Sequence, residues 1–426
     1  SVNCWPSLKF DIWSLNDRIS GLLPAGFYYK TFMWPKNFWH RYEKVIRKGA
    51  GLGTAPEEPD HNIYDKRYQH CDVLVVGGGP AGISAALAAG RSGARVFLVD
   101  EQAELGGALL GSGERVEAAS GVDWSMGARA ELDGMDNVRV LSRTTAFGYY
   151  DQNYILMVER LNDHLGAPAG TLRQRLWKIR AGQVVLATGA IERPMVFANN
   201  DRPGIMLAGA AQTYVNRFGV KPGNRAVIYC NNDVAYQAVL DLADAGVRIE
   251  AVVDTRAKPA SELITAVRER GIEVMVGHAV GGALGRKRLR GVEVLALNEK
   301  GDGFAGGIRR LRCDLLCLSG GWTPVVHLFS QSGGKLEYSD AQACFLPGEA
   351  RQAVSVTGSA NGVFSLKACL AAGAAAGRAA AKKSDFTEPG APQALPVSPA
   401  ATSPVMPVWC LPAVSKGERR FVDLHN

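Results

Sequence analysis

The chain has 426 residues, of which 47% are hydrophobic and 49 are glycine, so it can bury a full core and should divide into two or three domains. Its net charge of +7 comes from Lys and Arg residues spread along the chain, which does not favour a nucleic-acid partner. No apolar run reaches the roughly 20 residues that cross a bilayer, and no secretory signal is visible, so we expect no membrane association and a cytoplasmic location.

Residues 1–70 form an aromatic-rich extension that shows little helix or strand periodicity. Half of the eight tryptophans lie in its first 39 residues. Two compatible interpretations remain open. The segment is either a strap packed on the main core or a surface for another subunit, because clustered aromatic residues mark interface cores.

An α/β pattern begins at residue 71 with the strand CDVLVV, a glycine turn, a helix over 83–93 and the strand ARVFLVD. The turn reads Gly77-x-Gly79-Pro80-Ala81-Gly82, directly between a strand and a helix, which is the context that makes this motif specific for a dinucleotide. Gly77 permits the tight turn, Gly79 lets the backbone approach a pyrophosphate, and Gly82 allows close helix packing. The phosphates would lie at the helix N-terminus.

An acidic pair ends the second strand of this unit. Asp100, 18 residues beyond Gly82, is placed to accept hydrogen bonds from a ribose hydroxyl, with Glu101 as the alternative. A carboxylate here would repel a 2′-phosphate, which disfavours NADP.

Three later stretches resemble the nucleotide contacts of two-dinucleotide-domain flavoproteins. Gly106-Gly107 resembles their Gly-Gly stretch around the ribose and diphosphate, and the turn Ala187-Thr188-Gly189 resembles their second fingerprint. Gly358 stands where those proteins carry a Gly-Asp pair, but the acidic residue is replaced here, which weakens the case for FAD. The candidate set is completed by Ala146, in the β-rich run 138–160.

A second α/β unit follows from about residue 202, with the strand AVIYC, a helix over 233–246 and the strand RIEAVVD. Its turn, from Cys230 through Asn231, Asn232 and Asp233 to Tyr236, contains no glycine. Side chains there block close backbone approach, and Asp233 adds a like charge costing ~1 kcal/mol or more beside a diphosphate. We therefore expect a second dinucleotide to bind poorly.

The remaining chain contains the strand CDLLCLSGG, an alanine-rich final helix over 363–383, and a Pro/Ala-rich stretch after Ser384 that is typical of a linker. The predicted fold is α/β, with two nested Rossmann-like domains of the glutathione or thioredoxin reductase type. The expected domains are 71–200 plus 310–384 for the first, 201–309 for the inserted second, and 385–426 for the linker and tail, after which a continuation looks absent.

No catalytic pair and no metal site are predicted. The eight cysteines lack the spacing of a metal site or a redox dithiol, and we interpret them as buried free thiols. His164, His278 and His327 are isolated, and we interpret each as a surface or packing residue.

The runs VNCWPSLKFD, LLPAGFYYKTFMWP, RTTAFGYYDQNY, ATGAIERPMVF, NNDRPGIM and CNNDVAYQ together resemble the alpha subunit of heterotetrameric sarcosine oxidase across essentially the whole chain. The resemblance implies an assembly with beta, gamma and delta subunits that demethylates sarcosine to glycine with O2. It also implies NAD on alpha, FAD and covalent FMN held chiefly by beta, and tetrahydrofolate as acceptor, bound by a domain that this chain lacks. The aromatic extension, with Lys30, would form part of the wall facing FMN.

Three alternatives stay open. Alpha-type subunits of dye-linked proline or opine dehydrogenases and of hydrogen cyanide synthase share this core, but the lone Cys410 without a CxC favours the oxidase. A self-sufficient enzyme would bind FAD in the first unit and NADH in the second. In the third, the nucleotide is a structural prop and the chain is a non-catalytic scaffold.

Overall fold

The structure is a computed structural model that describes residues 6, 7, 10–12, 34, 35, 37–51, 57–166, 168, 170–387, 404–410 and 420–422. The chain divides into two units, Ser1–Asn62 and Ile63–Asn426. Within the first, helix α3 (Trp39–Ala50) ends at Gly51, whose φ of 69° is left-handed. Most of the aromatic extension, Lys30 included, lies outside the described residues.

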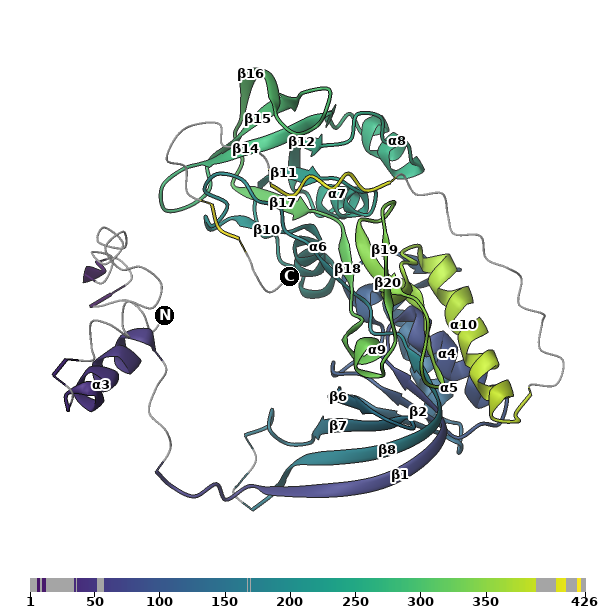
Figure 1. The fold of residues 1–426 in the computed structure, drawn as a ribbon. Helices are drawn as coiled ribbons and strands as arrows, with labels where there is room; N and C mark the ends of the chain where they lie inside the picture. The colour runs from purple at the N-terminus through teal and green to yellow at the C-terminus, as the bar shows by residue number, and fades with distance from the viewer. Residues whose placement is uncertain are drawn as a thin grey trace. The chain divides into compact units, whose positions relative to one another are not determined.

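The first nucleotide-type domain is built on a seven-stranded sheet in the order β5-β2-β1-β8-β7-β6, with β21 paired to β8 (Figure 1). Strands β1, β2, β5, β8 and β21 run parallel to one another, whereas β6, β7 and β8 form an antiparallel meander. The bounds are β1 (Ile63–Val76), β2 (Val96–Val99), β5 (Val138–Leu141), β6 (Thr144–Tyr150), β7 (Tyr154–Arg160), β8 (Leu172–Leu186) and β21 (Val354–Val356).

The boundary predicted at residue 70 is wrong, because β1 begins at Ile63 and pairs with β8 from that point. Most side chains of residues 63–70 are exposed, so the segment lacks the alternation of apolar and polar residues that indicates a half-buried strand. Pairing to β8 holds it in the sheet instead.

Helices α4 (Pro80–Arg91) and α10 (Leu366–Lys383) lie side by side on this sheet (Figure 1). Gly373 and Gly377 allow this close packing, because a Cβ at either position would overlap the backbone of Ala81 or Ala85. The domain is completed by η3 (Gly107–Gly111), β3 (Arg115–Val116), β4 (Ala119–Ser120), α5 (Gly121–Asp133), β9 (Ala190–Glu192), β18 (Trp322–Pro324), α9 (His327–Gln331), β19 (Leu336–Ser339), β20 (Cys344–Pro347) and η4 (Gly358–Asn361).

The second domain has a five-stranded parallel sheet in the order β10-β17-β11-β12-β13. Helices connect its strands, and an antiparallel sheet β14-β15-β16 covers one face through a shared hydrophobic core. The bounds are β10 (Ile205–Leu207), α6 (Ala208–Phe218), β11 (Arg225–Cys230), α7 (Ala235–Asp244), β12 (Arg248–Asp254), α8 (Glu262–Glu269), β13 (Val274–Val276), β14 (His278–Leu284), β15 (Gly291–Leu297), β16 (Phe304–Leu311) and β17 (Leu315–Ser319).

The predicted return to the first domain at residue 310 is also wrong. Strand β17 pairs with β10 and β11, so the second domain extends to Ser319. The strand is buried along its whole length, and an all-apolar run does not reveal which of two parallel sheets it joins.

The assignment of 385–426 as linker and tail needs a similar correction. Residues 404–410 pack on the second domain, where Val408 contacts its hydrophobic core. The stretch 388–403 lies outside the described residues.

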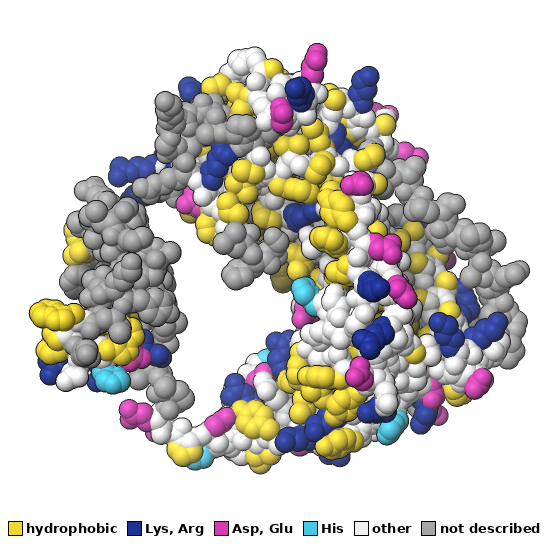
Figure 2. Space-filling model, in the orientation of Figure 1, with side chains coloured by type: hydrophobic (Ala, Val, Ile, Leu, Met, Phe, Trp, Pro, Cys, Tyr) yellow, Lys and Arg dark blue, Asp and Glu magenta, His cyan; other side chains and the backbone are white. Residues whose placement is uncertain are grey.

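The described surface mixes the two signs of charge. Figure 2 shows Lys and Arg side chains interspersed with Asp and Glu over the face it presents. Among the described residues, no helix has the length and hydropathy of a membrane span. Six cysteines are buried free thiols, as predicted, whereas Cys410 is exposed.

Candidate dinucleotide site

The glycine turn lies at the carboxyl ends of β1 and β8, where it leads into α4. Gly77 has a φ of +105°, and a Cβ there would overlap the carbonyl of Ala187 at the end of β8. A Cβ at Gly82 would overlap the carbonyl of Gly77. Both glycines are therefore required by the protein's own backbone, as their predicted roles in the turn and in helix packing imply.

Gly79 differs from these two because no described atom crowds it. The nearest atom to a Cβ at this position would be Gly107 Cα, at 4.0 Å. Gly79 is the N-cap of α4, and among the described residues no side chain caps this helix end, whereas Ser120, Ser261 and Ser365 cap α5, α8 and α10. The helix end therefore presents backbone N–H groups that no described side chain caps, and the backbone at Gly79 is uncrowded, which together suit a phosphate.

Asp100 holds this turn in place. Its carboxylate accepts hydrogen bonds from the backbone N–H of Gly78 at 2.5 Å and of Gln102 at 2.7 Å. The pKa of Asp100 is raised, because burial raises it by more than the two backbone hydrogen bonds lower it. A carboxylate has about four acceptor positions, so both oxygens can still accept from a ribose hydroxyl. Glu101 is exposed and its side chain has no such anchoring in the structure described.

The Gly106-Gly107 pair approaches the turn from the opposite side. The backbone N–H of Gly106 donates to the carbonyl of Gly78 at 2.8 Å, and a Cβ at Gly107 would lie 2.9 Å from Gly79 Cα. Both glycines have positive φ values, 135° and 54°. The pair therefore lies directly beside Gly79 at the start of α4.

The remaining predicted residues lie around the same edge of the sheet, with one exception. Gly189 has a φ of +80° and open space beside it, and a Cβ at Gly358 would lie 2.7 Å from that of Ala81. Thr188 Oγ1 donates to the carbonyl of Val325 at 2.6 Å. The exception is Ala146, which lies on β6 and packs against the hydrophobic cluster of the meander.

A further residue at this edge was missed by sequence reasoning. Thr357 follows β21, is 3% exposed, and its backbone N–H donates to Leu186 at the end of β8. Its hydroxyl has no hydrogen-bond partner among the described residues. A buried hydroxyl without a partner at this edge fits a bound group.

The close contact of α4 and α10 was also missed. The spacing Gly373-x-x-x-Gly377 was the sequence signal that could have predicted it.

These residues fit a dinucleotide. Gly77–Gly82 and Gly106-Gly107 would hold the pyrophosphate, Asp100 the ribose, and Thr357 a polar group near β21.

The described residues contain no cluster of three or more His, Cys, Asp or Glu side chains that could hold a metal. His278 contacts the carbonyl of Val276 at 2.8 Å, and His164 lies 3.6 Å from Asp163.

In the second domain, side chains fill the corresponding turn. Asn231, Asn232 and Asp233 follow β11 and are 0%, 4% and 7% exposed. Asn232 donates to both the carbonyl and the hydroxyl of Ser319 at 3.0 Å. Tyr236, where the first turn has Gly82, is fully buried.

A buried ion network explains the charge of this turn. Arg256 Nη1 lies 2.7 Å from Asp233 Oδ1, and Arg256 Nη2 donates to Asp254 at 2.8 Å. Burial acts to lower the pKa of Arg256, but the bonds and charges of the two aspartates outweigh it and raise the pKa. Tyr236 donates its hydroxyl to Asp254 at 2.8 Å. The charge of Asp233, predicted to face a diphosphate, is therefore largely compensated, and the packed side chains are the stronger obstacle.

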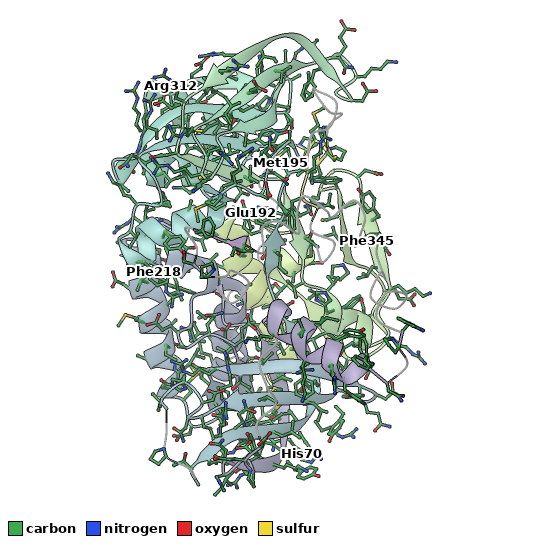
Figure 3. All side chains as sticks on the ribbon, turned by 90° about the vertical axis from the view of Figure 1, so that its left-hand side faces the viewer. His70, Glu192, Met195, Phe218, Arg312 and Phe345 are labelled. Atoms are coloured by element: carbon green, nitrogen blue, oxygen red, sulfur yellow. The ribbon has the colours of Figure 1, made fainter. Side chains whose placement is uncertain are left out.

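Glu192 lies between the two domains (Figure 3). It is 6% exposed and accepts a hydrogen bond from the backbone N–H of Gly209, at the start of α6, at 2.8 Å. Burial raises its pKa to about 7, although hydrogen bonds from Ser319 and Gly209 lower it.

Comparison with known proteins identifies relatives of the whole arrangement. A family model described as pyridine nucleotide-disulphide oxidoreductase matches residues 71–342. The alpha subunit of sarcosine oxidase from Rhizobium meliloti (strain 1021) is 42% identical over 429 residues, which cover 100% of this chain and 42% of that protein. The predicted resemblance is therefore confirmed, and the chain spans less than half the length of the curated sarcosine oxidase subunits it matches.

Two other comparisons are more distant. A subunit of opine oxidase from Agrobacterium tumefaciens (strain Ach5) is 30% identical over 293 residues, 65% of this chain and 57% of that protein. The crystal structure of T. acidophilum thioredoxin reductase matches with a TM-score of 0.55 and 17% identity, over 74% of this chain and 99% of that one. The predicted reductase-type fold is confirmed, and a dinucleotide cofactor follows from the family and the fold.

Proposed function

Because the chain belongs to the pyridine nucleotide-disulphide oxidoreductase family, we propose that it is the NAD-binding part of an alpha subunit of a heterotetrameric sarcosine oxidase. In this proposal the assembly oxidatively demethylates sarcosine to glycine, with O2 as electron acceptor and tetrahydrofolate as one-carbon acceptor. The similarity to the alpha subunit of sarcosine oxidase along the entire chain supports it.

The observation that carries the proposal is the contrast between the two turns. Gly79 is uncrowded at a helix end that no described side chain caps, whereas Asn231, Asn232 and Asp233 are buried in the second turn. A reductase that passes electrons from NADH to FAD needs two open dinucleotide sites. One open site fits a chain that holds a single NAD while the flavins, FAD and FMN, are bound chiefly by a beta subunit.

This chain would contribute binding and assembly, not acid–base catalysis. Gly77–Gly82 would hold the NAD diphosphate and Asp100 would hold its ribose. NAD supplies hydride chemistry when bound in other oxidoreductases, but here it would be a tightly held group that does not have to turn over. The partners would be beta, gamma and delta subunits, with FMN at the interface to beta.

Extraction of the nucleotide from the purified chain tests this proposal. We expect one NAD per chain, identified by its mass. FAD would instead support a self-sufficient reductase, and no nucleotide would support a scaffold. The activity is tested separately by O2 consumption with sarcosine in the assembly that contains the full-length subunit.

An opine oxidase is the second candidate, because one of its subunits is also related to this chain. The same assembly would then oxidise an opine in preference to sarcosine. A direct comparison of kcat/KM for the two amines separates the candidates.

A further inference from the structure

A short extended segment, residues 404–410, lies against the second domain, beside β11 and β17 (Figure 1). We propose that the carboxyl ends of β11 and β17 form a peptide-binding site, and that its ligand is residues 404–410 of the same chain. The second domain, in this view, has exchanged a nucleotide for a peptide.

The segment contacts Asn231 and Gly320, which follow β11 and β17, at the point where the strand order of this sheet reverses. In the order β10-β17-β11-β12-β13, the chain moves outward from β11 to β12 and β13, whereas β17 and β10 lie on the other side. The strand order therefore reverses between β11 and β17. Open α/β sheets bind their ligands outside the carboxyl ends of the strands at this point. The first domain places Gly77 and Ala187 at the equivalent point, after β1 and β8.

Asn231 supplies the polar contact at the end of β11. Its side-chain amide donates to the carbonyl of Met406 at 2.8 Å, and its backbone carbonyl accepts the N–H of Met406 at 3.4 Å. Asn231 occupies the position of the first glycine of the turn. A glycine would bring backbone close to a phosphate, whereas the asparagine side chain adds an amide donor that pairs with a peptide carbonyl.

Trp409 supplies the anchor at the end of β17. Its indole N–H donates to the carbonyl of Gly320 at 2.6 Å, and the guanidinium of Arg193 lies 4.5 Å from the ring centroid. The carbonyl of Trp409 accepts the N–H of Val196 at 2.6 Å. A tryptophan with its N–H bonded and a cation over its face is typical of an interface anchor.

The pattern of buried and exposed side chains along residues 404–410 agrees with these contacts. Val405, Met406, Val408 and Trp409 are partly buried, and Val408 packs against the hydrophobic core of the second domain. Pro404, Pro407 and Cys410 are exposed. The backbone N–H of Val405 also donates to the carbonyl of Ala341 at 3.0 Å. Backbone pairing combined with apolar pockets for part of the side chains is how proteins bind extended peptides.

A disulfide in the full-length chain tests the site without disrupting it. Val196 and the native, exposed Cys410 are partners in a parallel β-bridge, which brings them within disulfide range. With oxidised glutathione, we expect Val196→Cys to form an intrachain disulfide with Cys410. The control Ile191→Cys, exposed on β9 and not paired with Cys410, should form little. Equal yields from the two variants would overturn the proposal.

Hydrogen exchange of the unmodified chain provides an independent measurement. We expect the amides of Val405 and Met406 to exchange at least about tenfold more slowly than in a free peptide of residues 404–410. Trp409→Ala should remove this protection, whereas Phe147→Ala, at an exposed aromatic residue on β6, should keep it. Exchange at the free-peptide rate would contradict the proposal, as would loss of protection when NADH is added, because the cleft would then be a nucleotide site.

Discussion

The two nucleotide-type domains share a strand–turn–helix plan but use their turns in opposite ways. In the first, glycines let backbone segments approach one another closely and leave Gly79 uncrowded, and Asp100 fixes the turn through backbone N–H groups. In the second, side chains fill the turn, and Arg256 joins Asp233 and Asp254 in a buried network. The comparison indicates that the same strand–turn–helix plan can be held either by close backbone contacts at glycines or by packed and hydrogen-bonded side chains.

Replacing Arg256 should have the largest effect, because it leaves two carboxylates buried without their cation. We expect Arg256→Met to lower the free energy of unfolding by about 3–5 kcal/mol, the usual cost of breaking a buried ion pair from one side. Urea titration measures this loss.

A matched Arg–Asp pair in the first domain provides the control for Arg256. Arg95 pairs with Asp72 at 2.7 Å but is 63% exposed, so Arg95→Met should cost no more than about 1 kcal/mol. If the two replacements cost the same, the buried network is not what stabilises the second turn.

Glu192, at the junction of the two domains, should make the stability of the folded chain depend on pH. Its pKa is raised from 4.5 to about 7 in the folded chain, so the folded state holds a proton that the unfolded state releases between these values. Stability therefore falls as pH rises from about 4.5 to 7, by about 3 kcal/mol at 1.36 kcal/mol per pKa unit. Glu192→Gln removes this loss, and its advantage over the wild type should grow across this range and be constant above it.

Unfolding in urea at pH 5 and pH 8 measures the Glu192 effect. Glu349→Gln, at a side chain that is 79% exposed, should change stability equally at the two pH values. A Glu192→Gln advantage that does not depend on pH would mean that the buried carboxyl is ionised throughout.

Replacing Gly82 should have the next largest effect on stability, because the backbone of the same turn already occupies the position of an added Cβ. Replacing a glycine inside a helix by alanine normally stabilises the helix by about 1 kcal/mol. At Gly82 the added Cβ would overlap the carbonyl of Gly77, so Gly82→Ala should destabilise the chain by about 1–3 kcal/mol and reduce bound nucleotide. The control is Gly127→Ala in α5, where no described atom lies within 4 Å, and it should be neutral or stabilising.

Much of the first domain could be predicted because its determinants are local. The spacing of Gly77, Gly79 and Gly82 and the position of Asp100 lie within 24 residues of sequence. The second fingerprint at Thr188-Gly189 and the alanine-rich helix α10 were also visible as short patterns. The sites of contact among them followed from the known geometry of parallel strands.

The parts that could not be predicted depend on distant partners. Arg256 compensates Asp233 from beyond the next strand, and β17 joins the second sheet through pairing with β11, about 90 residues earlier in the chain. Residues 404–410 have the composition of a linker, and their contacts with residues far away in sequence, such as Asn231 and Gly320, show that they are bound. Local composition does not carry this information.

Gly79 isolates binding from folding, and its replacement should have the smallest effect on stability. Its backbone, with φ −76° and ψ −176°, is one that alanine adopts readily, and no described atom lies closer than 4.0 Å to the added Cβ. Gly79→Ala should therefore change the unfolding free energy of the nucleotide-free chain by no more than about 0.5 kcal/mol. The affinity for the nucleotide should fall at least about tenfold, equivalent to about 1.4 kcal/mol, because the added Cβ would lie where the diphosphate approaches the backbone.

The reverse change in the second domain completes this comparison. Asp233→Gly restores a glycine at the matching position, yet we expect no nucleotide to bind there, because Asn231 and Tyr236 still fill the turn and residues 404–410 still cover it. The ratio of nucleotide to chain, measured by mass after extraction, should fall below one only in Gly79→Ala and rise above one in neither variant. A second equivalent in Asp233→Gly would mean that a single carboxylate, and not the packed turn, excludes the ligand.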